Sequence, residues 1–230
     1  SYLKDRIRKG EILVGVVTKA LPDREYLERI LNGDSYDFIS IDSQHSPYDE
    51  DRLVEFCKMV NELGVHVQFR IKHTRNAYLI GNYLDLGPSG VEVPQVETVD
   101  TVQDALESFY FPQFGKRSWV GGHRVGGEDY PDRLEYASWW NTYGVLWMQI
   151  ESIPAVTNAR QFAIQGVDCL SFGPADLSFS LEADPRHPFK TIDDCVKHVV
   201  SQMEGSDVRV CFRNYEKELR TKYIDMGVTI

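Results

Sequence analysis

The stretch FISIDSQHSPYDEDRL, residues 38–53, shows the unit from which this chain is built. It opens on an apolar run, FISID at 38–42, that is typical of a strand buried in a parallel sheet. Ser46 then has the character of a helix N-cap, with Pro47 at the first helical position. Apolar residues recur at helical spacing from Leu53 onward, until Gly64 ends the pattern. The stretch therefore predicts a strand that leads into a helix through a short polar turn.

The same alternation repeats along the chain. Further apolar runs predict strands at 11–17, 65–71, 90–96, 145–151, 167–173 and 208–212, and an eighth strand is expected to begin at VTI, 228–230. Helical patterns lie between these strands. Buried strands separated by helices indicate an α/β fold, and we expect a closed (β/α)8 TIM barrel as a single domain, residues 1–230. An open doubly wound sheet also fits the alternation, but no GxGxxG follows the first strand.

One segment, from about 110 to 144, breaks this rhythm. It contains GKRSWVGGHRVGG and several aromatic residues. A connection this long usually carries local structure or function, so we interpret it as an irregular insert in the barrel. We expect Trp119 and Tyr130 in this insert to narrow the mouth of the barrel.

Composition and charge limit the possible partners. The formal net charge is −10 and the pI is about 5.1, which argues against a sequence-independent grip on nucleic acid or an anionic membrane. No apolar run reaches the length of a membrane span, and the first residues have no signal-peptide pattern. The four cysteines are irregularly spaced without a CxxC pair, which favours buried reduced thiols. We therefore expect a cytoplasmic protein that acts on a small molecule.

Polar side chains gather where the predicted strands end. In a (β/α)8 barrel these ends share one face, and the active site lies there. The residues concerned are Asp42, Gln44, His45, Arg70, Gln149, Glu151 and Asp176. Because they should meet on one face, we interpret them together as a candidate site.

The two carboxylates of this set, Glu151 and Asp176, would converge from neighbouring strands. Two protein oxygens, with other positions left to water or substrate, suit Mg²⁺ or Mn²⁺ better than Zn²⁺. Asp176 could instead cap a short turn. The sequence thus predicts a divalent-metal site, with a structural role for Asp176 as the alternative.

Arg70 and His45 supply the other chemistry. The Arg70 guanidinium could hold a substrate carboxylate through two parallel hydrogen bonds, or it could pair structurally with Glu92 or Glu97. His45 is a candidate proton acceptor, because imidazole titrates near neutral pH.

These motifs resemble the HpcH/HpaI aldolase family, the metal-dependent class II pyruvate aldolases. The matching pieces are YDFISIDSQHSP, VQFR, LIGNYLDLGPSGVEVPQVET, FPQFGKRS, VLWMQIES and GVDCLSFGPADLS. They keep their order and spacing from about residue 10 to the end of the chain. The resemblance implies a homo-oligomer and an enzyme, a carbon–carbon lyase, that needs a divalent metal, Mg²⁺, Mn²⁺ or Co²⁺.

Carried over by position, the resemblance also implies a role for each matching residue. Glu151 and Asp176 would be the metal ligands, Arg70 would hold the pyruvate carboxylate, His45 would be the catalytic base, Asp85 would be its dyad partner, and Gln149, Gly173, Pro174 and Ala175 would line the keto-acid site. The implied reaction forms or cleaves a 4-hydroxy-2-oxo acid through a metal-bound pyruvate enolate and an aldehyde.

The chain departs from the family pattern at position 44, where Gln replaces the usual Glu. The loss of one negative charge near the metal leaves two alternatives open. One is a metal-dependent oxaloacetate decarboxylase or related lyase that uses the same enolate. The other is a barrel that binds a keto acid without catalysis.

Overall fold

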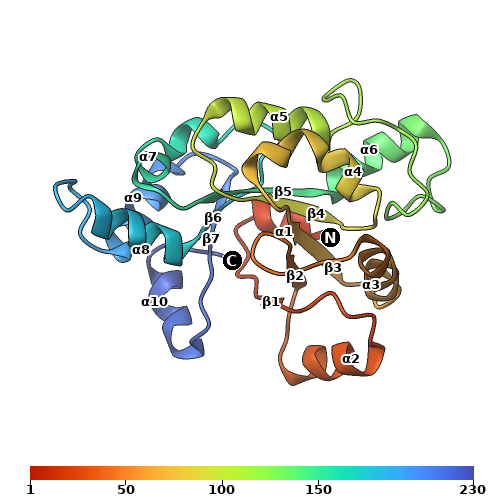
Figure 1. Cartoon of the computed structure of the whole chain (residues 1–230), viewed down its shortest axis with the longest axis horizontal. Helices are drawn as coiled ribbons and strands as arrows, with labels where there is room; N and C mark the ends of the chain where they lie inside the picture. Colours follow the sequence, from red (N-terminus) through yellow and green to blue (C-terminus); the bar gives the residue numbers. More distant parts are fainter.

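Seven parallel strands form the centre of the molecule. The computed structural model describes residues 1–230. The strands are β1 (Gly15–Val17), β2 (Phe38–Asp42), β3 (His66–Arg70), β4 (Gly90–Val93), β5 (Val145–Ile150), β6 (Cys169–Phe172) and β7 (Arg209–Phe212). They pair in sequence order, each parallel to the next. The result is an α/β fold with a curled half-barrel sheet, and helices cover its outer side (Figure 1).

Ten α-helices and three 3₁₀ helices accompany the strands. The α-helices are α1 (Leu3–Arg8), α2 (Arg24–Gly33), α3 (Glu50–Glu62), α4 (Ile80–Leu84), α5 (Val99–Phe109), α6 (Arg133–Tyr143), α7 (Ile153–Thr157), α8 (Pro174–Ala183), α9 (Ile192–Gln202) and α10 (Arg220–Asp225). The 3₁₀ helices are η1 (Thr74–Leu79), η2 (Ala159–Phe162) and η3 (Lys217–Leu219). Their apolar faces and the outer side of the sheet make one core of 43 buried residues.

One predicted helix start was wrong. Helix α3 begins at Glu50 rather than near Ser46, because the Asp49 carboxylate accepts a hydrogen bond from the Arg52 amide and acts as the N-cap. Helix α9 begins with a capping box, in which Thr191 is the N-cap and Asp194 supplies the second hydrogen bond. The four cysteines are buried and free, as expected.

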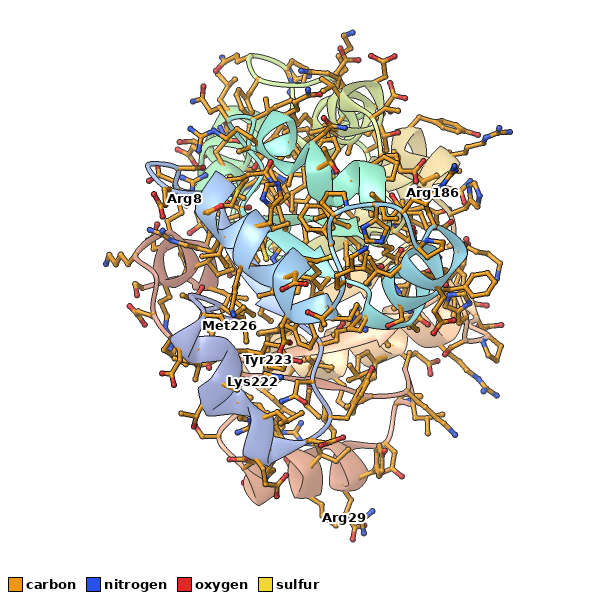
Figure 2. All side chains as sticks on the ribbon, turned by 90° about the vertical axis from the view of Figure 1, so that its left-hand side faces the viewer. Arg8, Arg29, Arg186, Lys222, Tyr223 and Met226 are labelled. Carbon is orange, nitrogen blue, oxygen red and sulfur yellow. The ribbon has the colours of Figure 1, made fainter.

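The expected eighth strand is not formed as a strand. Its residues nevertheless lie beside β7, since the Thr229 amide donates to the Val210 carbonyl and the Phe212 amide donates to the Ile230 carbonyl. On its other side, the Leu13 amide donates to the Thr229 carbonyl. The segment 228–230 thus bridges β7 and the residues that precede β1. Helix α10 packs on the same region, where Tyr223, labelled in Figure 2, stacks on Phe212.

Helix α1 covers the amino-terminal end of the sheet interior. Leu3 and Ile7 pack on Phe38 and Trp147 in a separate apolar cluster of eight buried residues. Beside them the buried Lys4 ammonium donates hydrogen bonds to the Asp168 carboxylate, the Tyr110 hydroxyl and the Gly144 carbonyl; the first is 2.7 Å long. Burial lowers the pKa of Lys4 against the opposing effect of Asp168.

The insert lies at the amino-terminal end of the sheet. It therefore does not narrow the opening at the carboxyl end of the strands in the same chain. It connects the end of α5 to the start of β5, and it contains helix α6. Tyr130 stacks on Trp139, which stacks on Tyr143, and the Tyr143 hydroxyl reaches Ser89, just before β4. Figure 1 shows α6 and α7, which precede and follow β5, on opposite sides of the molecule. The role expected for Trp119 and Tyr130 was therefore wrong.

Among the helices, none has the length and apolar character needed to cross a lipid bilayer.

Candidate functional site

Strand register places the polar strand-end residues side by side. Asp42 of β2 is the register neighbour of Arg70 of β3, and Arg70 is the neighbour of Glu92 of β4. Side chains alternate between the two faces of a strand. Gln149 and Glu151 therefore share the side of β5 that carries Trp147, which packs in the interior cluster. The carboxyl end of the sheet interior is thus lined by polar side chains.

Arg70 is held by its neighbours on both sides. Its Nε donates to Asp42 Oδ1 at 2.7 Å, and its Nη1 donates to Gln149 Oε1 at 3.1 Å. The structural alternative, an ion pair of Arg70 with Glu92 or Glu97, is not formed. Burial acts to raise the pKa of Asp42, but the hydrogen bond and charge of Arg70 outweigh it and leave that pKa lowered. The guanidinium is therefore fixed and charged at the end of β3.

Glu151 follows β5 and is almost buried, with 6% of its surface exposed. Its Oε2 accepts a hydrogen bond of 2.8 Å from the backbone amide of Gln95. Burial, together with the nearby charge of Asp176, raises the pKa of Glu151 to about 7 against the opposing effects of the Gln95 hydrogen bond and Arg70. A nearby cation would stabilise the charged form of this carboxylate and so offset the effects of burial and of the Asp176 charge.

Two backbone features hold Glu151 in place. Gln95 has a φ of +48°, a left-handed conformation that is uncommon outside glycine and that aims its amide at the carboxylate. Gly173 lies against the other side, where an added Cβ would come within 2.5 Å of Glu151 Cγ and 2.6 Å of its Cδ. Only glycine allows the backbone and the carboxylate to approach so closely. Asp176 lies one turn further on, in the first turn of α8.

Two buried amide atoms at the site have no hydrogen-bond partner. Gln149 donates nothing from its Nε2, although its Oε1 is bound to Arg70, and Gln44 Oε1 accepts nothing. A buried polar atom without a partner costs free energy unless a water or a ligand satisfies it. The Gln149 amide is therefore available to a bound oxygen beside Arg70.

His45 and Asp85 are not brought together within the chain. His45 is exposed in the turn after β2, where its backbone amide donates to Asp42 Oδ2. Asp85 caps the end of α4, five residues before β4, and therefore lies toward the amino-terminal end of the sheet. There it accepts a hydrogen bond of 3.0 Å from Arg117 of the insert. Burial raises the pKa of Asp85 against the opposing effect of Arg117.

Sequence reasoning missed a second buried network beneath the site. Glu92 is fully buried; its carboxylate accepts a hydrogen bond of 2.6 Å from the Ser171 hydroxyl and forms an ion pair with Arg213, just after β7. The alternation of side chains in β4 could have placed Glu92 inside, but no site residue was predicted at the end of β7, where Arg213 lies. This network supports the β4, β6 and β7 side of the site.

The arrangement fits a hard divalent cation. Glu151 and Asp176 offer carboxylate oxygens, the ligands that Mg²⁺ and Mn²⁺ prefer. No group of three or more His, Cys, Asp and Glu side chains is placed to bind a metal, which argues against a closed zinc site. Such a centre would leave positions for water or substrate, next to Arg70 and the free Gln149 amide.

Comparison with known proteins finds a family match. The profile of the HpcH/HpaI aldolase/citrate lyase family matches residues 22–213. The chain belongs to this family. The resemblance expected from the motifs is thereby confirmed, and aldolases and citrate lyases are both carbon–carbon lyases, the enzyme class that was expected.

Named relatives of this family lie at moderate distance. The chain is 28% identical over 179 residues to the 2-keto-3-deoxy-L-rhamnonate aldolase of Escherichia coli O1:K1; the match covers 77% of this chain and 66% of that protein. The HpcH/HpaI aldolase of Desulfitobacterium hafniense DCB-2 has the same fold, with a TM-score of 0.86 at 24% identity over 100% of this chain and 88% of that one. A family protein from Burkholderia cenocepacia J2315 gives 0.81 at 24% identity, over 99% and 90% of the two chains.

Proposed function

We propose that this chain is a divalent-metal-dependent aldolase that forms or cleaves a 4-hydroxy-2-oxo acid. The observation that supports this most is the placement of Glu151 beside Asp176, with the fixed Arg70–Gln149 pair nearby. The bound ion, Mg²⁺, Mn²⁺ or Co²⁺, would supply Lewis acidity at a 2-oxo acid. The family membership supports the same reaction class.

Residues of the chain would bind and orient the keto acid. Arg70 would orient the keto-acid carboxylate, since Asp42 and Gln149 already hold its guanidinium in one place. The unpaired Gln149 Nε2 would donate to an oxygen of the same molecule. The backbone at Gly173, Pro174 and Ala175 opens helix α8 beside Glu151 and would wall the site.

His45 would transfer the proton at the aldehyde oxygen. Its exposed position at the mouth suits a group that meets the second substrate. Because Asp85 lies toward the opposite end of the same sheet, it could act as the dyad partner of His45 only in a homo-oligomer, from a second copy of the chain. The proposed dyad of His45 and Asp85 would therefore form only in the assembled oligomer.

The reaction is tested through the proton that it must remove. Metal-stripped protein is given Mg²⁺, Mn²⁺ or Co²⁺ with pyruvate in D₂O, and loss of the methyl signal is followed by proton NMR. Exchange should require metal and should be abolished by Glu151→Gln or Asp176→Asn. Glu182→Gln, an exposed change on the same helix as Asp176, serves as the control and should exchange normally. Absence of exchange with all three metals would refute the proposed function and favour a keto-acid-binding barrel.

Two further measurements separate the alternatives. Loss of oxaloacetate without aldehyde-dependent bond formation would favour the decarboxylase. The dyad is tested by mixing inactive His45→Ala and Asp85→Asn proteins after partial unfolding. Activity regained only in the mixture would place the two residues in different subunits, whereas a mixture without activity would argue against a shared site.

A further inference from the structure

The carboxylate of Asp85 has one bound oxygen and one free oxygen. Its Oδ1 accepts a hydrogen bond of 3.0 Å from Arg117 Nη2. No hydrogen bond reaches its Oδ2 within the chain, and 19% of the Asp85 side chain is exposed. Gly121 packs against this side chain, where an added Cβ would lie 2.9 Å from Asp85 Cβ. The insert therefore fixes one edge of the carboxylate and leaves the other edge accessible from outside.

Arg117 is itself fixed by the core. Its side chain is fully buried, and its guanidinium carbon lies 4.7 Å from the centre of the Phe111 ring and 5.0 Å from that of Trp140. Helix α4 closes in on its stem, since a Cβ added at Gly81 would lie 2.9 Å from Arg117 Cγ. The guanidinium thus has little freedom to move and holds the Asp85 carboxylate in one place.

The charge of Asp85 depends on this contact. Burial raises the pKa of Asp85, while the hydrogen bond and charge of Arg117 and the charge of Arg124 oppose that effect. Tyr136 of α6 is the other titratable group that faces these charges. Arg124 makes no hydrogen bond to Asp85; it stacks on the rings of Trp119 and Tyr136. Without Arg117, the partly buried carboxyl group would therefore keep its proton to higher pH.

Arg117 is poorly suited to a purely structural role. Its Nε and Nη1 are buried and have no hydrogen-bond partner. A buried ion pair that leaves donors unpaired contributes little to stability, and apolar side chains of similar volume can often replace such a pair without loss. The pair is better explained by its effect on Asp85.

We propose that Arg117 is a positioning residue, which holds the Asp85 carboxylate charged and in place so that its free oxygen accepts a hydrogen bond from His45 of a second copy of the chain. This inference rests on the proposed function. In cleavage the bond between C3 and C4 breaks, its electron pair stays with the keto-acid fragment, and the hydroxyl proton passes to the His45 imidazole. A charged Asp85 stabilises the imidazolium that forms and fixes the orientation of the ring.

Loss of the Arg117 charge should therefore act through pH. Asp85 and His45 together would then bind one more proton near neutral pH. That proton must leave before His45 can accept the proton of the substrate. Cleavage should be slow in acid and should recover in alkali, whereas a purely structural defect would lower the rate by the same factor at every pH.

The test measures kcat/KM for cleavage of 4-hydroxy-2-oxopentanoate with Mn²⁺ saturating, and compares each variant with wild type at the same pH. Arg117→Met should be slower on the order of tenfold at about pH 6 and by less than about twofold at about pH 9. Arg117→Lys keeps the charge and should follow wild type more closely. In an Asp85→Asn background, Arg117→Met should add no further pH dependence. The control is Lys116→Met, which removes the neighbouring exposed lysine that pairs with Glu107.

The Asp85 titration, followed by carboxyl ¹³C NMR of the assembled protein, gives a readout without turnover. Arg117→Met should move it to higher pH, and His45→Ala should also change it. An unmoved titration in either variant, or a rate loss of Arg117→Met that is equal at every pH, would overturn the role of Arg117. Arg117→Gln takes the place of Arg117→Met if that variant does not fold.

Pyruvate exchange separates this inference from the proposed function. Exchange needs no aldehyde, so its loss in Arg117→Met would indicate a general disruption of the site and would overturn the positioning role. If the wild type showed no exchange with any metal, the proposed function would fail. The Asp85 titrations of Arg117→Met and His45→Ala would then decide on Arg117 by themselves.

Discussion

Glycine at position 173 should be essential for cation binding, although its backbone could accept alanine. Its φ of −106° is ordinary for any residue. An alanine Cβ, however, would lie 2.5 Å from Glu151 Cγ, whereas ordinary contact begins at 3.4 Å. Glu151 would have to move by at least about 0.9 Å, because its Oε1 lies nearer still, and misplacement on the order of 1 Å can cost about a hundredfold in activity. Metal–ligand distances tolerate only about 0.2 Å.

The assay for Gly173→Ala is Mn²⁺ binding followed by electron paramagnetic resonance, together with pyruvate exchange in D₂O. We expect at least a tenfold weaker Mn²⁺ affinity and about a hundredfold slower exchange at fixed metal. Gly33→Ala is the matched control, since no atom lies within 4 Å of the added methyl group. If Gly173→Ala bound Mn²⁺ as tightly as wild type, Glu151 would not be a ligand in the position described.

Three further predictions follow from the same structure. Because burial raises the pKa of Glu151 to about 7, Mn²⁺ affinity should rise with pH through about 7 and level off roughly one unit above that pKa; a flat titration would contradict this. Gln95→Gly should keep Mn²⁺ affinity near wild type, whereas Gln95→Val should weaken it, because valine resists a φ of +48°. Equal affinities in the two variants would show that the left-handed backbone at position 95 does not matter for the Glu151 position. Lys4→Met should destabilise the fold by about 3 kcal/mol in urea unfolding, because the buried Asp168 carboxylate then keeps only the Leu146 amide and a 3.3 Å contact to Arg8. Arg24→Met, in an exposed pair, should cost under about 1 kcal/mol.

Strand positions could be predicted from the sequence because burial on both faces leaves continuous apolar runs. The strand expected at 38–42 has the same bounds in the structure, and those expected at 145–151 and 208–212 differ by one residue at an end. Helix starts were harder to predict, since Ser46 and Asp49 are both good caps and only the folded chain shows which carboxylate or hydroxyl accepts the amide.

Candidate site residues could be named from the sequence, but the hydrogen bonds and ion pairs between them could not be predicted. Asp42 and Arg70 meet because β2 and β3 pair with one particular register, and no local pattern specifies that register. Glu92 was taken as part of an apolar strand, and its contact with Arg213 spans 121 positions of the chain. The error over Trp119 and Tyr130 has a simpler cause: a segment that precedes a strand lies at the amino end of that strand, away from the site.

The contact between Lys4 and Asp168 also affects the order of folding during synthesis. These residues are 164 positions apart, so helix α1 leaves the ribosome long before Asp168, the partner of Lys4, has been synthesised. Until then the Lys4 ammonium stays hydrated, because burying it without a partner would be unfavourable, and α1 does not dock on the sheet. We expect the final closing of the amino-terminal end to be a late event, which a nascent chain stalled before residue 168 could not complete.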